Sequence, residues 1–107
     1  MEILVPAADA TIDELSFFAL RYDGYGLHGG VSGVADIGER VEQQWRDGSL
    51  PADLDELRAA LFFVQRAAHW NGNFDLSFAR ALIEQIREVS GRIVDGRPDI
   101  TMPGAGS

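Results

Sequence analysis

The stretch DLDELRAALFFVQRAAHWNGNFDLSFARALIEQIREVSG, residues 53–91, decides the fold. In both of its halves apolar residues recur every three or four positions, which is the spacing of an amphipathic helix. Asp53 followed by Glu56 is a capping signature for the start of the first helix. A short polar turn between the halves makes the two helices antiparallel. The sequence therefore predicts a helical hairpin with its first arm, turn and second arm at residues 54–70, 71–73 and 76–90.

Each arm carries an apolar stripe that we expect to face the core. The stripe of the first arm consists of Leu54, Leu57, Leu61, Val64 and Ala68, and that of the second arm consists of Phe78, Ala79, Leu82, Ile83, Ile86 and Val89.

Phe62 lies outside the stripe of the first arm, among the polar residues Arg58, Arg66 and His69. Three interpretations are open. Another element of the chain covers Phe62, or Phe62 forms a contact patch with its basic neighbours, or it is buried across the two-fold axis of a homodimer.

Two further helices are predicted before the hairpin. Thr11 and Glu14 form a capping box, which predicts a helix at residues 12–22 with Ile12 on its buried side. A second helix is expected at residues 34–46. The whole chain is predicted to be one mainly α-helical domain of four helices, with residues 91–107 as a loosely structured tail. A short β pairing between the two termini is possible.

The loop at residues 24–33 contains five of the twelve glycines. It includes the pattern G-x-G-x-x-G, but a dinucleotide site needs a strand before that pattern, and here a helix is predicted. We therefore expect no nucleotide and no other cofactor. The loop is either a flexible connection or a binding loop that presents Tyr22, Tyr25, Leu27 and His28.

The charge is asymmetric. The formal net charge is −8; residues 1–56 carry twelve acidic residues and three arginines, whereas residues 57–107 carry five acidic residues and six arginines. An acidic half disfavours nucleic acids and anionic membranes as partners and favours basic protein surfaces. The simpler alternative is that these acids only keep the protein soluble. The absence of cysteine, of a signal peptide and of a long apolar run leads us to expect a cytoplasmic protein.

Catalytic motifs are scarce in the sequence. The two histidines, His28 and His69, are not in a recognisable metal-ligand spacing, and no serine lies in a nucleophile-elbow pattern. We predict no catalytic and no metal-binding residues. The alternative is a small-ligand- or metal-binding enzyme that uses His28 and His69 with Tyr22 and Asp23 around the glycine-rich loop.

The run Leu61-Phe62-Phe63-Val64-Gln65-Arg66, with His69 a turn later and Ala79-Arg80-Ala81-Leu82-Ile83-Glu84 in the second arm, resembles a family of small uncharacterised bacterial proteins. The similarity covers about residues 57–90. In that family a second basic or aromatic residue follows the arginine, whereas Ala67 and Ala68 follow Arg66 here. The resemblance implies the helical hairpin and a bacterial or phage origin, and it implies no reaction.

These observations predict a small acidic protein-binding module, such as a regulator, inhibitor or immunity-type protein, that contacts a basic surface of a partner protein. The expected binding residues are Tyr25, Leu27, His28, Asp36, Glu39, Glu42, Arg58, Phe62, Arg66 and His69.

Overall fold

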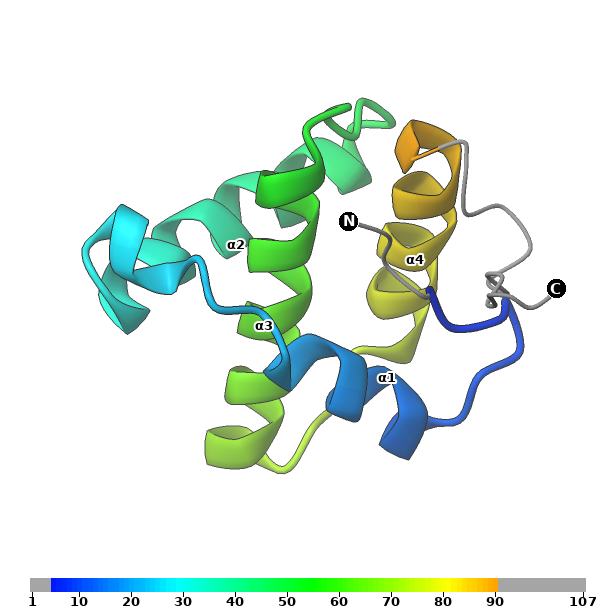
Figure 1. Ribbon diagram of the computed structural model, residues 1–107, viewed down its shortest axis with the longest axis horizontal. Coiled ribbons are helices and arrows are strands. Elements are labelled where there is room, and N and C mark those ends of the chain that lie inside the picture. The colour runs from blue at the N-terminus through cyan, green and yellow to red at the C-terminus, as the bar shows by residue number, and fades with distance from the viewer. Residues whose placement is uncertain (1–4, 91–107) are drawn as a thin grey trace, which may run out of the picture.

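The computed structural model describes residues 5–90 and consists of four α-helices and one short 3-10 helix (Figure 1). The four predicted helices are present, and no strand occurs within the described range. The predicted pairing of the termini and the tail at 91–107 lie outside the described residues. The elements in chain order are α1 (Ile12–Leu20), η1 (Tyr25–His28), α2 (Val31–Arg46), α3 (Leu54–Asn71) and α4 (Leu76–Ser90).

Helix α1 begins with the predicted capping box. The Glu14 amide donates to Thr11 Oγ1 at 3.1 Å, and the Thr11 amide donates to Glu14 Oε1 at 2.8 Å. The helix buries Leu15, Phe18 and Ala19, whereas Ile12 is 44% exposed, so its predicted burial is wrong. Ile12 is the first residue of the helix, and only the later turns of α1 reach the core.

Helix α2 begins three residues before its predicted start. Gly29 and Gly30 have φ angles of +86° and +84°, which are readily accessible only to glycine, and they turn the chain directly into Val31. Ser32 and Gly33, expected in the loop, are therefore helical.

Helices α3 and α4 run in opposite directions (Figure 1). Asp53 caps α3 by accepting from the Glu56 amide at 3.1 Å, and Gly72, with φ +71°, ends it. Asp75 Oδ1 accepts from the Phe78 amide at 3.2 Å at the start of α4. The main core contains the predicted stripe of the second arm and that of the first arm except Ala68, which is half-buried outside it. Its fully buried large side chains on these two helices are Leu57, Leu61, Phe78, Leu82, Ile83 and Ile86.

Helix α3 is central, because α1, α2 and α4 all pack against it. The contact with α2 is close at Gly38, where an added Cβ atom would lie 2.3 Å from Cγ of Phe63. This packing, together with the chain after α1, covers Phe62. Its side chain is only 7% exposed, and its ring centroid lies 6.1 Å from that of Tyr22.

The burial of Phe62 decides among the three interpretations of this residue. Phe62 belongs to a small core cluster with Tyr22, Val34 and Ala59. It is covered by its own chain, so it does not provide an exposed contact, and its burial does not require a second subunit.

The segment before α1 is held against α4 by two arginines. Arg87 Nη1 donates to the carbonyl oxygens of Val5 and Pro6 at 3.3 and 3.0 Å, and Arg80 Nη2 donates to that of Ala10 at 3.4 Å. Among the described helices, none is long and apolar enough to span a membrane.

Candidate functional site

A cluster of three polar side chains joins three separate elements of the fold. Tyr22 follows α1, His28 ends η1, and Asp55 lies in the first turn of α3. The Tyr22 hydroxyl donates to Asp55 Oδ1 at 2.7 Å. His28 Nε2 lies 2.7 Å from Asp55 Oδ2 and 3.0 Å from the Tyr22 hydroxyl oxygen. The cluster therefore ties the glycine-rich segment to the central helix.

These distances indicate which ring nitrogen of His28 donates in the cluster. Because the Tyr22 hydroxyl donates to Asp55, a proton on His28 Nε2 is directed towards the other carboxylate oxygen. A neutral His28 with its proton on Nε2 has an unprotonated Nδ1, which can accept a hydrogen bond. The His28 and Asp55 side chains are 22% and 44% exposed, so water reaches both of them.

Tyr22 is held as a neutral hydrogen-bond donor. Burial raises the pKa of Tyr22 far above its ordinary value, and the hydrogen bond to Asp55 raises it further. Arg58 opposes this shift in pKa to a smaller degree. The Arg58 guanidinium carbon lies 5.6 Å from the Tyr22 ring centroid and 5.4 Å from that of Phe18, so Arg58 covers both rings.

Two glycines make close contacts around the cluster. An added Cβ atom at Gly24 would lie 2.6 Å from the Tyr22 hydroxyl oxygen, and one at Gly33 would lie 1.4 Å from the His28 carbonyl oxygen. His28 is thus fixed through its side chain to α3 and through its backbone against α2. The preceding residue, Leu27, has 86% of its surface exposed. The loop is therefore fixed at His28, beside the exposed apolar side chain of Leu27.

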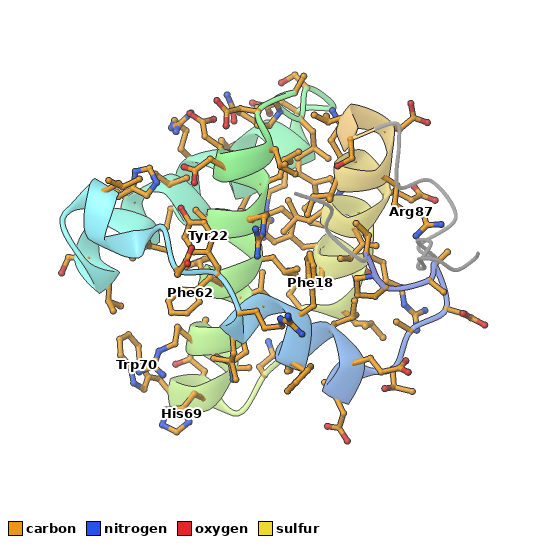
Figure 2. All side chains as sticks on the ribbon, viewed as in Figure 1. Phe18, Tyr22, Phe62, His69, Trp70 and Arg87 are labelled. Atoms are coloured by element: carbon orange, nitrogen blue, oxygen red, sulfur yellow. The ribbon has the colours of Figure 1, made fainter. Side chains whose placement is uncertain are left out.

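A groove with a cavity volume of about 270 Å³ lies between α2 and α3. Trp70 at its edge is 67% exposed, and the Arg66 guanidinium carbon lies 5.7 Å from the Trp70 ring centroid. Figure 2 shows Trp70 and His69 together at the end of α3, away from Tyr22. The residues that line the groove are Val31, Val34, Ala35, Glu39, Phe62, Phe63, Arg66, Ala67, Trp70 and Asn71.

A second, larger cavity of about 1060 Å³ lies beside α4 and includes Trp45 and Leu50. It contains none of the predicted binding residues. Neither cavity is lined by Tyr22, His28 or Asp55.

The structure separates the predicted binding residues into several places. Tyr22 and His28 meet, but His69 does not join them. Arg58 covers core rings, whereas Arg66 stacks on Trp70 at the groove. The side chain of Tyr25 lies outside the described part of the chain.

The three acids predicted on α2 differ in their surroundings. Asp36 and Glu39 are exposed. Glu42 is half-buried and forms an ion pair with Arg46 at 2.9 Å. Arg40 of the same helix pairs with Glu56 of α3 at 3.1 Å. Asp36 and Glu39 are therefore the α2 acids that are accessible to a partner.

Asp55 and Trp70 were missed as site residues. Asp55 lies in the first turn of a helix, where acidic residues are common because they suit the helix dipole, so its sequence position did not distinguish it. Trp70 is the penultimate residue of α3. Its position just before Asn71 and Gly72, where the helix ends, was the available signal that it could be exposed.

No group of three or more histidine, aspartate or glutamate side chains is placed to hold a metal ion within residues 5–90. No protein-family model, curated protein or solved structure matches the chain.

Proposed function

We propose that the protein is a small protein-binding module whose partner carries a basic surface. This proposal rests on the exposure of Leu27. Its side chain is 86% exposed on a segment held in place by the Tyr22–His28–Asp55 cluster. A flexible loop would lose conformational entropy when a partner ordered it. A loop that is already fixed avoids much of this cost, so an exposed apolar residue on it is suited to anchor a partner.

The binding face extends from Leu27 to the groove between α2 and α3. Val31, four residues after Leu27, is 38% exposed and lines the groove, and Trp70 lies at the same groove. Tryptophan and arginine are the residue types most enriched among the energetically dominant residues of protein interfaces, and here Arg66 stacks on Trp70. Leu27 and Trp70 take the anchoring role that the sequence had suggested for Phe62.

The charge supports a basic partner. Asp36 and Glu39 are exposed on α2, and the chain as a whole has a formal net charge of −8. The attraction due to this charge accelerates the encounter with a basic protein, and the attraction weakens as the salt concentration increases. A regulator, inhibitor or immunity-type protein of bacterial or phage origin fits this description. In it the α3–α4 hairpin is the scaffold on which α2 and the glycine-rich segment present the binding face.

The alternative, a small-ligand-binding protein or enzyme, is favoured by one observation. His28 and Asp55 form a histidine–carboxylate pair of the kind that general bases use, and the Tyr22 hydroxyl donates to the carboxylate. A melting-temperature screen with small metabolites and divalent metal ions tests this alternative. A shift that is lost in His28→Gln would favour the ligand-binding function over the protein-binding function.

The protein-binding function is tested by capture from a lysate of the source organism with matched variants. Leu27→Ala and Trp70→Ala remove exposed anchors, and Phe17→Ala is the control because Phe17 is also apolar and 66% exposed but lies on α1. We expect one partner to be retained by the wild type and by the control, to be lost from the other two variants, and to be released by increasing salt. Equal retention by all four proteins contradicts the proposal.

A further inference from the structure

The groove between α2 and α3 has a charged residue of opposite sign on each of its two helices. Glu39 belongs to α2 and Arg66 to α3, and both line the groove. Within the described residues the side chain of Glu39 forms no ion pair or hydrogen bond, and the interaction found for the Arg66 side chain is its stacking on Trp70. The two charges are therefore available to a ligand.

We propose that this groove binds a short segment of a partner protein that places one apolar side chain between the helices. A basic residue of the segment pairs with Glu39, and an acidic residue pairs with Arg66. This inference rests on the proposed protein-binding function and specifies the chemistry of the partner at this part of the face.

The lining of the groove suits an apolar side chain. The cavity volume of the groove is about 270 Å³. Its lining is mostly apolar, with Val31, Phe63 and Trp70 as its largest exposed or half-buried apolar members. One apolar side chain fits such a space, and the rest of its segment would remain on the surface.

Arg66 is prepared for a carboxylate. Its Nε atom is buried and has no hydrogen-bond partner in the described part of the chain, and its guanidinium is held over the Trp70 ring. A guanidinium that is already oriented and partly removed from water gains more from a carboxylate than a free surface arginine does. Glu39 is exposed, so its pairing with a basic residue would contribute mainly to selectivity.

The groove is also held in shape. Gly38, one residue before Glu39, allows α2 to approach Phe63 of α3 closely, because any Cβ atom there would overlap the Phe63 ring. The two helices therefore keep a fixed separation at the groove, and a binding segment does not need to open it.

Selection from a phage-displayed library of random dodecapeptides tests the inference, with the Trp70→Ala variant used for counter-selection. We expect the selected peptides to share an apolar residue with Lys or Arg on one side and Asp or Glu on the other. In nitrogen-15 NMR titrations of the wild type, these peptides should shift the indole N–H signal of Trp70. The Trp45 indole is an internal control, because Trp45 stacks on Phe78 at a centroid distance of 5.0 Å and does not line the groove.

Charge variants test the two pairings separately. Glu39→Arg should lower the affinity for a selected peptide about threefold, as expected for an exposed ion pair. The Glu39→Arg variant should bind well again when the basic residue of that peptide is changed to glutamate. Arg66→Gln should weaken it about tenfold, because the lost contact is a partly buried charged hydrogen bond. Glu84→Arg on α4 makes the same charge change away from the groove and should leave the affinity unchanged.

Three results would overturn the inference. Selected peptides could move the Trp45 signal instead of the Trp70 signal, or bind equally well after either charge change. Light scattering could instead show a dimer that Trp70→Ala dissociates, which would mean that a second copy of the chain occupies the groove. If the lysate partner still depends on Leu27 and Trp70 in any of these cases, the protein-binding function survives and only the assignment of the groove fails.

Discussion

Replacing Gly38 by alanine should destabilise the protein, although the same replacement in an exposed helix is stabilising. Gly38 lies in the middle of α2 and is buried. An added Cβ atom would lie 2.3 Å from Cγ, 2.4 Å from Cδ2 and 2.5 Å from Cβ of Phe63. These distances are more than 1 Å shorter than the optimal separation of about 3.5–4.0 Å between carbon atoms. Since the Phe63 Cβ atom is attached to the backbone of α3, a side-chain rotation alone does not remove the overlap.

The magnitude follows from two opposing effects. Alanine in a helix interior is favoured over glycine by about 1 kcal/mol. Overpacking of a well-packed core costs about 1–3 kcal/mol, and the severity of the overlap places Gly38→Ala near the upper end. We expect a net loss of about 2 kcal/mol in the free energy of unfolding. For a chain of this size that corresponds to a decrease of about 8 °C in Tm.

The assay is urea unfolding followed by circular dichroism, for Gly38→Ala in the wild type and in a Phe63→Ala background. In the Phe63→Ala protein the overlaps with Cγ and Cδ2 are removed, whereas the overlap with the Cβ atom at 2.5 Å remains. The same replacement should therefore destabilise the Phe63→Ala protein less than the wild type. This difference between the two backgrounds is specific to the close approach of α2 and α3.

If Gly38→Ala has the same effect in both backgrounds, or if it stabilises the wild type, then the contact with Phe63 does not determine its effect. Gly26→Ala is the control, because no atom lies within 4 Å of a Cβ atom added there and its φ angle is not positive. Its effect should be zero or slightly stabilising.

Three other predictions concern the cluster and a helix cap. In a Tyr25→Phe protein, whose single tyrosine is then Tyr22, ultraviolet absorbance should show no tyrosinate at pH 10 while the protein is folded. Because the pKa of Tyr22 is higher in the folded than in the unfolded chain, stability should fall as pH rises above about 10, and Tyr22→Phe should remove this fall. At neutral pH, Tyr22→Phe should lower the free energy of unfolding by about 1 kcal/mol. In urea unfolding of the double variant with Asp55→Asn, the two losses should not add up; strictly additive losses would contradict the hydrogen bond. Asp53→Ala should cost about 1 kcal/mol by loss of the α3 cap, whereas Asp47→Ala, at an exposed bond to Gln43, should change stability by less than about 0.5 kcal/mol.

The helices and their caps were predictable because their causes are local. The Thr11 capping box and the Asp53 cap depend on residues three positions apart, and both form as predicted. The stripe of α4 also depends only on spacing along one helix, and five of its six predicted members are buried. These features need no knowledge of what packs against them.

The candidate site was only partly predictable because its causes are tertiary. Tyr22 and His28 were candidates for one loop, but the partner that joins them, Asp55, lies 27 residues beyond His28. Phe62 lay outside the apolar stripe that spacing defines, and whether it was covered depended on where Tyr22 and Val34 would lie. No spacing rule within one helix reveals either relation.

The glycines link the fold to the proposed binding face. From composition alone, the loop at 24–33 could be a flexible connection. In the structure Gly24 admits the Tyr22 ring and Gly33 admits the His28 carbonyl group, so these two residues lack side chains because neighbouring atoms occupy the space. His28 is then restrained through its side chain and its carbonyl group, and the adjacent Leu27 is displayed from a restrained position. A partner that contacts Leu27 therefore meets a surface whose shape is set by core packing, and substitutions at Gly33 should weaken binding through the position of Leu27 without touching the partner.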